Sequence, residues 1–589
     1  MYLSNIKLWN FRKFGKEGQF DLEKPDLDLN FTNGLNVFIG ENDTGKTAII
    51  DAIKLVLKTH SYEKLRITQE DFFANQDRLR IELKFIDLLD NEAKNFTEWL
   101  GWEGSGKHAK PYLRLIYDVR RKIEDPYIYP ADVRAGVDET GYPLTAEARE
   151  YLKVTYLKPL RDAYGELVPR RNSRLSQILM GHEAFKGKNE DHILVKQFET
   201  FNKSVEEYFE HENESESECQ KGKELKNEID KFIHSFYSNE KESNFTVTEG
   251  NLKSILEKLE LTIKDEINPG LGTLNRLFMA VELVHLQKKN WNGIRLGLIE
   301  ELEAHIHPQA QMQIIESLQK EKNIQLILTT HSPNLGSKVK LENLILCTNN
   351  YVFPLGNEYT ELDEKDYKFL ERFLDTTKAN LFFAKGVIFV EGWSEEILLP
   401  ALARKLKKQG VIDKDLTESG ISIVNIGNTA FLHYSRIYLR KEELFLDIPV
   451  AIVTDIDLRE YVIDDNGNII SNDITQEQKK SKIEEIKKRW ERQSVKVFVT
   501  PNWTLEYALY KSTSLSQNFK EIFKIIHPQI DEENYEVELA KKLINKRLKK
   551  TEIAYKLAQE IETNDDIEID ENDEPIKYLI EAIKYVSND

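Results

Sequence analysis

The segment GENDTGKT, at residues 40–47, limits strongly how this chain can fold. It matches the pattern G-x-x-x-x-G-K-[ST], and it lies between the apolar run LNVFI (35–39) and the helix-like segment TAIIDAIKLVLK (47–58). A strand before the loop and a helix after it are what a phosphate-binding loop requires. The glycines let the backbone curl so that its N–H groups face phosphate oxygens. We therefore predict a nucleotide site at Gly40, Glu41, Asn42, Asp43, Thr44, Gly45, Lys46 and Thr47.

Two of these residues have specific expected roles. The Lys46 ammonium would reach the β- and γ-phosphates, and the Thr47 hydroxyl would bind Mg²⁺. A second G-x4-G-K segment, GWEGSGKH (101–108), has histidine in place of Ser or Thr, and a polar, helix-like EWL precedes it. We predict an ordinary loop there.

An acidic segment further along fits as the partner of the phosphate loop. In RLGLIEELEAHIHP (295–308) an apolar strand runs into adjacent acids. Nucleotide hydrolases place one such carboxylate on Mg²⁺ and another beside the attacking water, so we assign Glu300 to the ion and Glu301 to general-base catalysis. The alternative is a glutamate-rich first turn of a helix. His305 and His307 are two residues apart and would diverge on a helix, which argues against a zinc site.

A histidine follows another predicted strand, in LILTTHSP (326–333). His331 at that strand end would contact the γ-phosphate or polarise the water. A purely structural strand-end residue is the alternative when this segment is considered alone.

A third block of the chain places carboxylates at the ends of three predicted strands. Strand GVIFV (386–390) leads to Glu391 and Glu395, VAIVTD (450–455) leads to Asp455 and Asp457, and VKVFVT (495–500) leads to Glu506. Asp455 and Asp457 would lie on one face if the chain stays extended. Carboxylates gathered at one sheet edge repel one another unless cations are present, so we predict two Mg²⁺ or Mn²⁺ ions for phosphodiester cleavage. Ordinary acidic strand ends are the alternative.

The composition excludes several classes of protein. No run of about 18 apolar residues occurs, and the N-terminus has no signal-peptide pattern, so we expect no membrane association. Only Cys219 and Cys347 are cysteines, which excludes a disulfide framework or a cysteine-based zinc cluster and suits the cytoplasm. The net charge of −19 argues against a broadly basic surface but not against a local groove or bound ions that attract nucleic acid.

Charged segments are distributed unevenly. Residues 560–574 carry nine acidic and no basic side chains, a pattern typical of a solvated face or a mobile tail. Two basic segments, KKSKIEEIKKRW (479–490) and KKLINKRLKK (541–550), could follow a DNA backbone. A solvated helix face with i,i+4 ion pairs is the alternative for both. The polar stretch from about 170 to 265 is predicted as an inserted helical arm.

Several segments together resemble the ABC-type ATPase head of the SMC/RecF class: NFRKF (10–14), the phosphate loop, NPGLGTLNRLF (268–278), LIEELEAHIHPQ (298–309) and TTHSP. In that class the signature segment of one head closes over nucleotide bound to another head. The resemblance implies signature positions at Gly270, Gly272 and Asn275, a phosphate contact at Arg12 and a Q-loop residue at Gln69. Leu302 replaces the proline of the usual EEPE form, which affects the turn but not the carboxylates.

The Glu-Gly…Asp-x-Asp pattern of the third block resembles the Toprim domain, and the order of the two parts is similar to that of OLD (overcoming lysogenization defect) family ATP-dependent endonucleases, including the nuclease subunit of Gabija-type defence systems. This resemblance also implies a late catalytic lysine. In KKTEIAYKLA (549–558), Lys550 is the better match and Lys549 the fallback, with a solvent-exposed lysine as the alternative. Its charge would stabilise the transition state.

The predicted fold class is α/β: an ABC-type (SMC/RecF-like) P-loop ATPase with an inserted helical arm, followed by a Toprim Rossmann-like α/β domain. The expected parts are an N-terminal ATPase segment (1–169), a helical insertion that serves as a dimerisation arm (170–265), a C-terminal ATPase segment (266–378) and a Toprim nuclease domain (379–589).

The predicted function is an ATP-regulated, divalent-metal-dependent endonuclease acting on double-stranded DNA. ATP with one Mg²⁺ would bind the head, and a homodimer or homotetramer would complete the ATP sites. Antiviral defence and a helicase partner are hypotheses drawn from the resemblance. The alternative is an SMC/RecF-like DNA-binding clamp with a non-catalytic Toprim module, for which 170–265 is too short to supply long coiled coils. A topoisomerase or primase would need a further domain, and no segment is left unassigned for one.

Overall fold

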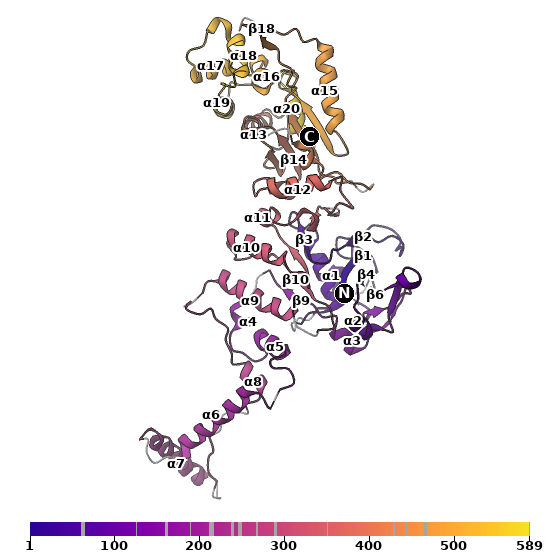
Figure 1. Cartoon of the computed structure of the whole chain (residues 1–589), viewed down its shortest axis with the longest axis vertical. Helices are drawn as coiled ribbons and strands as arrows, with labels where there is room; N and C mark the ends of the chain where they lie inside the picture. Colours follow the sequence, from indigo (N-terminus) through magenta and orange to yellow (C-terminus); the bar gives the residue numbers. More distant parts are fainter. Residues whose placement is uncertain are drawn as a thin grey trace. The chain divides into compact units, whose positions relative to one another are not determined.

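Figure 1 shows a computed structural model of the chain. It describes residues 1–60, 65–124, 127–159, 163–188, 190–210, 217–236, 241–245, 250–266, 269–287, 291–349, 351–427, 430–442, 445–464 and 468–587. The chain divides into two compact units. Unit 1 contains Met1–Ile6, Ile50–Ala310 and Glu321–Ile327, and unit 2 contains Lys7–Ile49, Gln311–Lys320 and Leu328–Asp589. Within these described ranges, none of the helices combines the length and apolar character that a membrane span requires.

A seven-stranded sheet has the order β2-β1-β4-β6-β7-β8, with β5 paired to β6. Its long central pair, β4 (Arg78–Ile86) and β6 (Lys110–Arg120), is antiparallel. The other strands are β1 (Tyr2–Trp9), β2 (Leu27–Asn30), β5 (Leu100–Glu103), β7 (Arg134–Ala135) and β8 (Tyr142–Pro143). Residues 98–100 were predicted to be helix-like, but residues 98 and 99 form a turn and Leu100 begins strand β5. The segment 101–108 was predicted to be a loop, but its first three residues belong to β5 because their backbone pairs with β6.

A six-stranded sheet holds the strands that precede the predicted ATPase residues. Its order is β13-β12-β3-β11-β10-β9. The strands are β3 (Leu35–Ile39), β9 (Thr155–Leu157), β10 (Leu296–Ile299), β11 (Gln325–Thr329), β12 (Leu344–Cys347) and β13 (Val352–Pro354). Strands β3, β10, β11 and β12 are buried along their whole length. This explains their continuous apolar runs, because strands covered on both faces do not alternate.

Three helices continue from or pack beside this sheet. Helix α1 (Lys46–Leu57) follows β3, helix α10 (Pro308–Leu318) follows β10, and helix α9 (Leu271–Leu286) precedes β10. Gly270 is the N-cap of α9 and has extended backbone angles. Helix α9 therefore begins inside the predicted signature segment.

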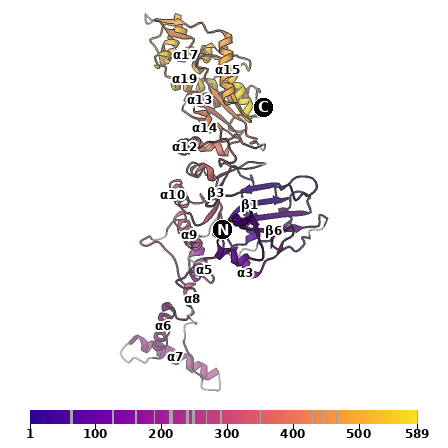
Figure 2. The same cartoon turned by 45° about the vertical axis from the view of Figure 1, so that its right-hand side comes forward.

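The polar stretch predicted as helical contains α5 (Arg174–Gly181), α6 (Ile193–Glu210), α7 (Ser217–Phe236) and α8 (Leu252–Leu256). Helix α6 contacts both α7 and α8 (Figure 2). Val195, Leu252 and Leu256 form a small core of their own. A buried ion pair between Arg174 and Glu282, with N–O distances of 2.6 and 2.8 Å, joins α5 to α9.

The third block forms a four-stranded parallel sheet with the order β15-β14-β16-β19. The strands are β14 (Gly386–Val390), β15 (Ile421–Asn425), β16 (Val450–Thr454) and β19 (Val495–Val499). Strands β14, β16 and β19 agree with the three predicted strands to within one residue at each end. Strand β16 lies between β14 and β19, so the residues that follow these three strands meet at one edge.

Helices cover both faces of this four-stranded sheet. Side chains such as Ile388 and Val453 pack in one core with α13 (Trp393–Lys408), α19 (Lys550–Thr563) and α20 (Lys577–Ser587). Phe389 points to the other face, where its ring lies 6.1 Å from that of Tyr434 in α14 (Phe431–Ser435). Helix α15 (Gln476–Trp490) lies beside β19, on the other side of the strands from α13 and α19 (Figures 1 and 2).

The acidic segment 560–574 was expected to be a solvated face or a mobile tail, but it is anchored. Ile567 and Ile569 are buried in the core of the same region. Asp573 is also buried, and it accepts hydrogen bonds from the Ser512 hydroxyl and from the N–H groups of Thr513 and Ser514. Alternating isoleucines and one buried carboxylate therefore fix a segment whose composition indicated solvent exposure.

Candidate active sites

The phosphate loop has the conformation that its sequence predicts. Gly40, Asp43 and Gly45 have φ values of +136°, +59° and +96°, and these values favour glycine at the two ends. A Cβ on Gly40 would lie 2.1 Å from the Cys347 carbonyl oxygen, and one on Gly45 would lie 2.7 Å from the Phe14 ring. The loop leads directly into α1, whose first residue is Lys46.

The Lys46 ammonium folds back over the loop. It donates to the Gly40 carbonyl at 2.8 Å, to the Glu41 carbonyl and to the Thr44 hydroxyl at 3.2 Å. These carbonyls hold a positive charge at the centre of the loop, as phosphate recognition requires. The Thr47 side chain is exposed.

Two further basic side chains border the loop. The Lys13 ammonium donates to the Asp43 carbonyl at 3.1 Å, and burial lowers its pKa. His331 Nδ1 lies 3.2 Å from the Gly40 carbonyl. Lys13 was not predicted from the sequence, because only Arg12 of the NFRKF segment was selected. Arg12 itself has a φ of +51° and stacks over the Phe11 ring at 5.3 Å.

Glu300 and Glu301 differ in environment. Glu300 is buried, and its Oε1 accepts a hydrogen bond of 2.8 Å from the Tyr156 hydroxyl. Its N–H continues the pairing of β10 with β9 by donating to the Leu157 carbonyl at 3.0 Å. Glu301 is partly exposed and has a φ of +44°. The strand therefore ends at Glu300, and the next carboxylate leaves it in a left-handed conformation.

The predicted signature residues pack against the loop after Glu301. The Asn275 amide donates to the Ala304 carbonyl at 3.2 Å. A Cβ on Gly272 would lie 2.6 Å from the His305 carbonyl oxygen. The start of α9 and the acidic loop thus form one packed structure within unit 1. His305 contacts the start of α9 through its backbone carbonyl.

Gln69 lies in a short 3-10 turn, Gln69–Asp71. Its Oε1 and its carbonyl both accept hydrogen bonds of 2.9 Å from the Arg121 guanidinium. The Arg121 guanidinium also lies 4.6 Å over the Phe72 ring. The Gln69 side chain is therefore held by Arg121, the residue that follows β6. The assignment of Gln69 as a Q-loop residue stays a prediction.

Four of the carboxylates predicted for the third block lie together at the carboxyl edge of the four-stranded sheet. We call Glu391, Glu395, Asp455 and Glu506 the carboxylate cluster. Glu391 Oε1 accepts a hydrogen bond from the Thr454 hydroxyl and one of 3.1 Å from the Asp455 N–H. Asp455 Oδ1 in turn accepts the Leu505 N–H at 2.9 Å, at the start of α16 (Leu505–Lys511). The ends of β14 and β16 and the start of α16 are thereby joined.

Glu506 is the most central member of the carboxylate cluster. It is buried in the first turn of α16. Its Oε1 accepts from the Ser394 hydroxyl at 3.4 Å, and its Oε2 lies 2.8 Å from the Lys550 ammonium. Lys549, the fallback in the sequence prediction, pairs instead with Glu552 at 3.1 Å. The structure brings Lys550, and not Lys549, to the carboxylates.

The pKa shifts show how strongly these groups interact. Burial and the charge of Glu506 raise the pKa of Glu395 to about 7. Burial, followed by the charges of Glu506 and Glu395, raises the pKa of Asp455 well above its usual value. Burial also raises the pKa of Glu391. Burial lowers the pKa of Lys550, but the charges of Glu506 and Asp455 raise it by more, so the ammonium stays protonated.

Asp457 does not lie on the same extended strand as Asp455. Its φ is +57°, because strand β16 ends at Thr454 and the chain turns. Its N–H donates to the Trp503 carbonyl at 3.3 Å, and its side chain is exposed. The argument from two-residue spacing therefore fails. Asp457 still acts on the cluster, because its charge contributes to the raised pKa of Glu391.

Among the described residues, no three His, Cys, Asp or Glu side chains are arranged as a preformed metal cage. The cluster nevertheless fits divalent ions chemically. Its donors are carboxylate oxygens, the ligands that Mg²⁺ and Mn²⁺ prefer. Crowded acids with raised pKa values release their protons when a cation binds beside them. Glu391, Glu395, Asp455 and Glu506 are the residues that would hold such ions, with Asp457 at the exposed side.

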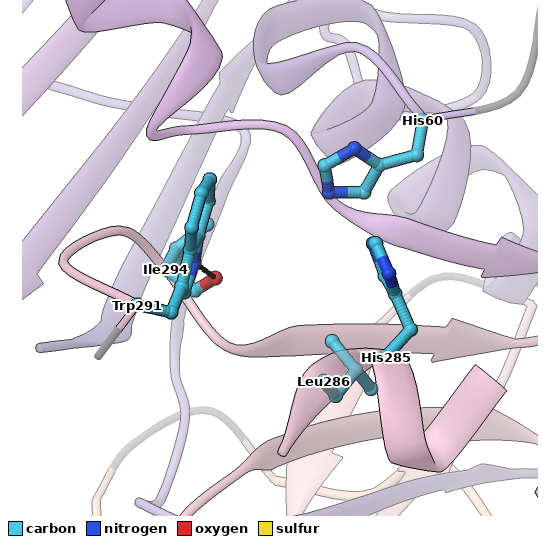
Figure 3. Close-up of a pocket in the computed structure, with 5 residues that line it drawn as sticks. All are labelled: His60, His285, Leu286, Trp291 and Ile294. Carbon is cyan, nitrogen blue, oxygen red and sulfur yellow. Dashed lines mark hydrogen bonds between the residues drawn. The ribbon is translucent and has the colours of Figure 1, made fainter. Parts of the chain in front are cut away.

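A small pocket in unit 1 was not predicted from the sequence. It is lined by His60, His285, Leu286, Trp291 and Ile294 (Figure 3). The two histidine rings meet edge to face, with centroids 4.8 Å apart and an interplanar angle of 86°. His60 follows α1, and His285 lies in the last turn of α9. The end of the helix that begins at the phosphate loop therefore contacts the end of the helix that begins at the signature segment.

Comparison with known proteins identifies the class of protein to which this chain belongs. Residues 1–335 match a family model described as an AAA ATPase domain, and residues 382–457 match one described as the overcoming lysogenization defect protein-like TOPRIM domain. An ATPase is therefore joined in one chain to a Toprim domain. Because the first match covers more than half of the chain, the protein belongs to the AAA ATPase domain family, in a form that carries an OLD-like Toprim domain.

Three relatives match this chain across most of its length. Endonuclease GajA of Bacillus cereus (strain HuB5-5) is 21% identical over 547 residues, which cover 78% of this chain and 77% of the relative. Endonuclease GajA of Bacillus cereus (strain VD045) is 23% identical, with coverage of 74% and 72%. The OLD nuclease of Thermus scotoductus is 24% identical, with coverage of 77% and 82%.

These matches confirm two sequence predictions. The resemblance to the OLD family was carried by the phosphate loop, the acidic segment and the Toprim pattern, and family models now cover those segments. The predicted fold class, an ABC-type P-loop ATPase followed by a Toprim α/β domain, is likewise confirmed. The roles of single residues remain predictions.

Proposed function

We propose that this protein is an ATP-regulated endonuclease that cleaves DNA with divalent metal ions. One observation carries the proposal: two buried and two partly buried carboxylates, with a lysine paired to one of them, share one edge of a parallel sheet in a Toprim domain. The names of the relatives, endonuclease GajA and OLD nuclease, support the same activity.

The cluster residues would divide the work as follows. Glu391, Glu395, Asp455, Asp457 and Glu506 would hold two Mg²⁺ or Mn²⁺ ions, which stabilise the attacking and leaving oxygens when they are bound. Lys550 keeps its charge because Glu506 and Asp455 favour it. Its ammonium would stabilise the negative charge that develops on the phosphate. Thr454 and the N–H of Leu505 orient Glu391 and Asp455.

The ATPase residues would regulate this cleavage. The loop residues Gly40 to Thr47 would bind the phosphates, Glu300 would hold the Mg²⁺ that accompanies ATP, and Glu301 would activate water. His331 would contact the γ-phosphate. If signature residues close over nucleotide on a second copy, the working form is a homodimer or homotetramer. The proposed protein has four parts, at residues 1–169, 170–265, 266–378 and 379–589. It would act in the cytoplasm in antiviral defence, together with a helicase partner.

A plasmid assay tests the proposal. Supercoiled double-stranded DNA is incubated with purified protein and Mg²⁺ or Mn²⁺, with and without ATP. We expect nicked and linear products from the wild-type chain and none from Glu391→Ala or Asp455→Ala. Lys46→Ala should keep the capacity to cleave but lose the response to ATP. Cleavage that persists undiminished in both cluster variants would refute the metal-site assignment.

A further inference from the structure

We propose, on the basis of the endonuclease function above, that the Toprim domain selects DNA with an unpaired base beside the cleaved phosphate. Trp393 would stack on that base. The basic segment, defined as residues 541–550, would bind the backbone on the opposite side of Glu506.

Trp393 is a large aromatic residue that is exposed to solvent at the start of a helix. It is the first residue of α13, and 63% of its surface is exposed. In the described part of the chain, no aromatic ring or cation packs against its indole. It lies between two groups of the cluster, because Glu391 is two residues before it and the next residue, Ser394, donates to Glu506. An open indole face at this edge is therefore available to a ligand.

The basic segment lies on the other side of Glu506. It runs from the end of α18 (Tyr535–Ile544) to the first residue of α19 and contains six basic and no acidic residues. Its last member, Lys550, is the one that touches Glu506. Lys546 and Arg547 are exposed, and within the described residues no carboxylate pairs with either of them. Their charges are thus available for phosphates.

The charges of this segment act on a neighbouring group, His527. Burial lowers the pKa of His527, and the charges of Lys542 and Lys549 lower it further. The segment therefore retains a positive field although the chain as a whole carries a net charge of −19. A local positive field next to an acidic cluster is what a strand needs to approach carboxylates that would otherwise repel it.

Glu506 fixes the geometry between the two elements. One of its oxygens is contacted from the Trp393 side by Ser394, and the other is contacted from the basic side by Lys550. In the proposed complex, a phosphate at the cluster would lie between Trp393, the sequence neighbour of Ser394, and the cations of the basic segment. Aromatic faces stack on single-stranded bases without sequence preference.

The exposed indole favours an unpaired base over an intact duplex. Inside a duplex each base already stacks on both faces, so a side chain gains a stacking partner only when a base is unpaired, at an end or flipped out. Cations alone would not discriminate, because phosphates are present in both forms. Trp393 is therefore the discriminating element, and the basic segment supplies affinity that depends on salt.

Binding measurements separate these contributions. Fluorescence anisotropy with labelled oligonucleotides in Ca²⁺ buffer compares a single strand, a fully paired duplex and an RNA strand of the same sequence. The variants are Trp393→Ala, Trp393→Phe and the double variant Lys546→Ala/Arg547→Ala. Trp102→Ala is the matched control, because Trp102 is also 63% exposed but lies in β5. Lys320→Ala/Lys322→Ala is the control for charge.

We expect Trp393→Ala to weaken single-strand binding by about 5- to 150-fold, with Trp393→Phe close to wild type because it retains an aromatic face. The duplex should respond less than about threefold. Lys546→Ala/Arg547→Ala should weaken both DNAs and lower the slope of log K against log salt by about 2. Both control variants should bind like wild type.

The opposite results overturn the inference. An equal loss for duplex and single strand refutes selection of an unpaired base, and a Trp393-dependent affinity for RNA that equals the one for DNA refutes the assignment to DNA. Unchanged single-strand binding by Trp393→Ala refutes the stacking role. Cleavage is assayed separately with Mg²⁺ or Mn²⁺, so failure of the wild-type chain to cut any DNA would reject the endonuclease function independently of these binding results.

Discussion

The raised pKa of Glu395 predicts that the stability of the Toprim domain falls as pH rises in the absence of divalent ions. Glu395 is 8% exposed, and burial together with the charge of Glu506 raises its pKa from 4.5 to about 7. The folded state therefore favours the protonated carboxyl. Its contribution to stability is complete below pH 4.5 and is lost as pH rises through 7.

The magnitude follows from the pKa interval. Each unit of pH in that interval corresponds to about 1.4 kcal/mol, so the whole interval corresponds to roughly 3 kcal/mol. About 2 kcal/mol of this falls between about pH 5.5 and pH 8.0. The raised pKa values of Asp455 and Glu391 act in the same direction. Mg²⁺ or Mn²⁺ should restore the stability at the higher pH, because a bound cation favours the ionised carboxylates.

The assay is urea unfolding at the two pH values in EDTA, followed by pulsed hydrogen–deuterium exchange. Peptides from α13 and α16 report on this domain separately from the rest of the chain. Glu395→Gln should reduce the loss between the two pH values by about 2 kcal/mol. Glu396→Gln is the control, because the adjacent carboxylate accepts from Asn425 and lies outside the cluster. The same pH dependence in wild type and Glu395→Gln would refute the reasoning.

Three further predictions concern the ATPase part. Lys46→Ala removes the ammonium at the centre of the phosphate loop and should weaken binding of a fluorescent ATP analogue by about 30-fold or more; unchanged affinity would contradict the loop assignment. Glu301→Gln should slow phosphate release by about 100-fold or more while ATP binding persists, and normal turnover would exclude it as the base. Glu282→Ala leaves the buried Arg174 without its partner, so unfolding of the region around α5 and α9, followed in urea, should require about 3–5 kcal/mol less. Wild-type stability in that variant would show that the ion pair contributes nothing.

Local sequence patterns predicted the strands and the phosphate loop well, because the conformation of each depends mainly on residues close to it in the sequence. Strand β3 at 35–39 and strand β14 at 386–390 have the predicted bounds. The phosphate loop follows from the need for glycine at φ values that other residues avoid. The carboxylate cluster could be predicted because parallel strands place their carboxyl ends at one edge.

Contacts between distant segments could not be predicted in the same way. Tyr156 reaches Glu300 across 144 residues, and no local pattern in the sequence marks it. The choice between Lys549 and Lys550 depends on which side of a helix start faces Glu506. The expectation for Asp457 failed because its backbone turns to a φ of +57°, and a two-residue spacing cannot reveal such a turn.

The anchored acidic segment shows a related limit of composition. Nine acidic side chains between 560 and 574 predicted exposure. Hydrogen bonds to Asp573 and the burial of Ile567 and Ile569 place the segment against the domain instead. A few buried positions therefore decide the conformation of a segment whose average composition is polar.

The claim that the carboxylate cluster is the metal centre can be measured directly by Mn²⁺ titration followed by electron paramagnetic resonance, without nucleotide or DNA. We predict that the wild-type chain binds two Mn²⁺ ions whose spins couple, and that Asp455→Ala and Glu506→Ala each abolish the coupled signal while Glu396→Gln retains it. Equal Mn²⁺ binding by the wild-type chain and Asp455→Ala would contradict the account.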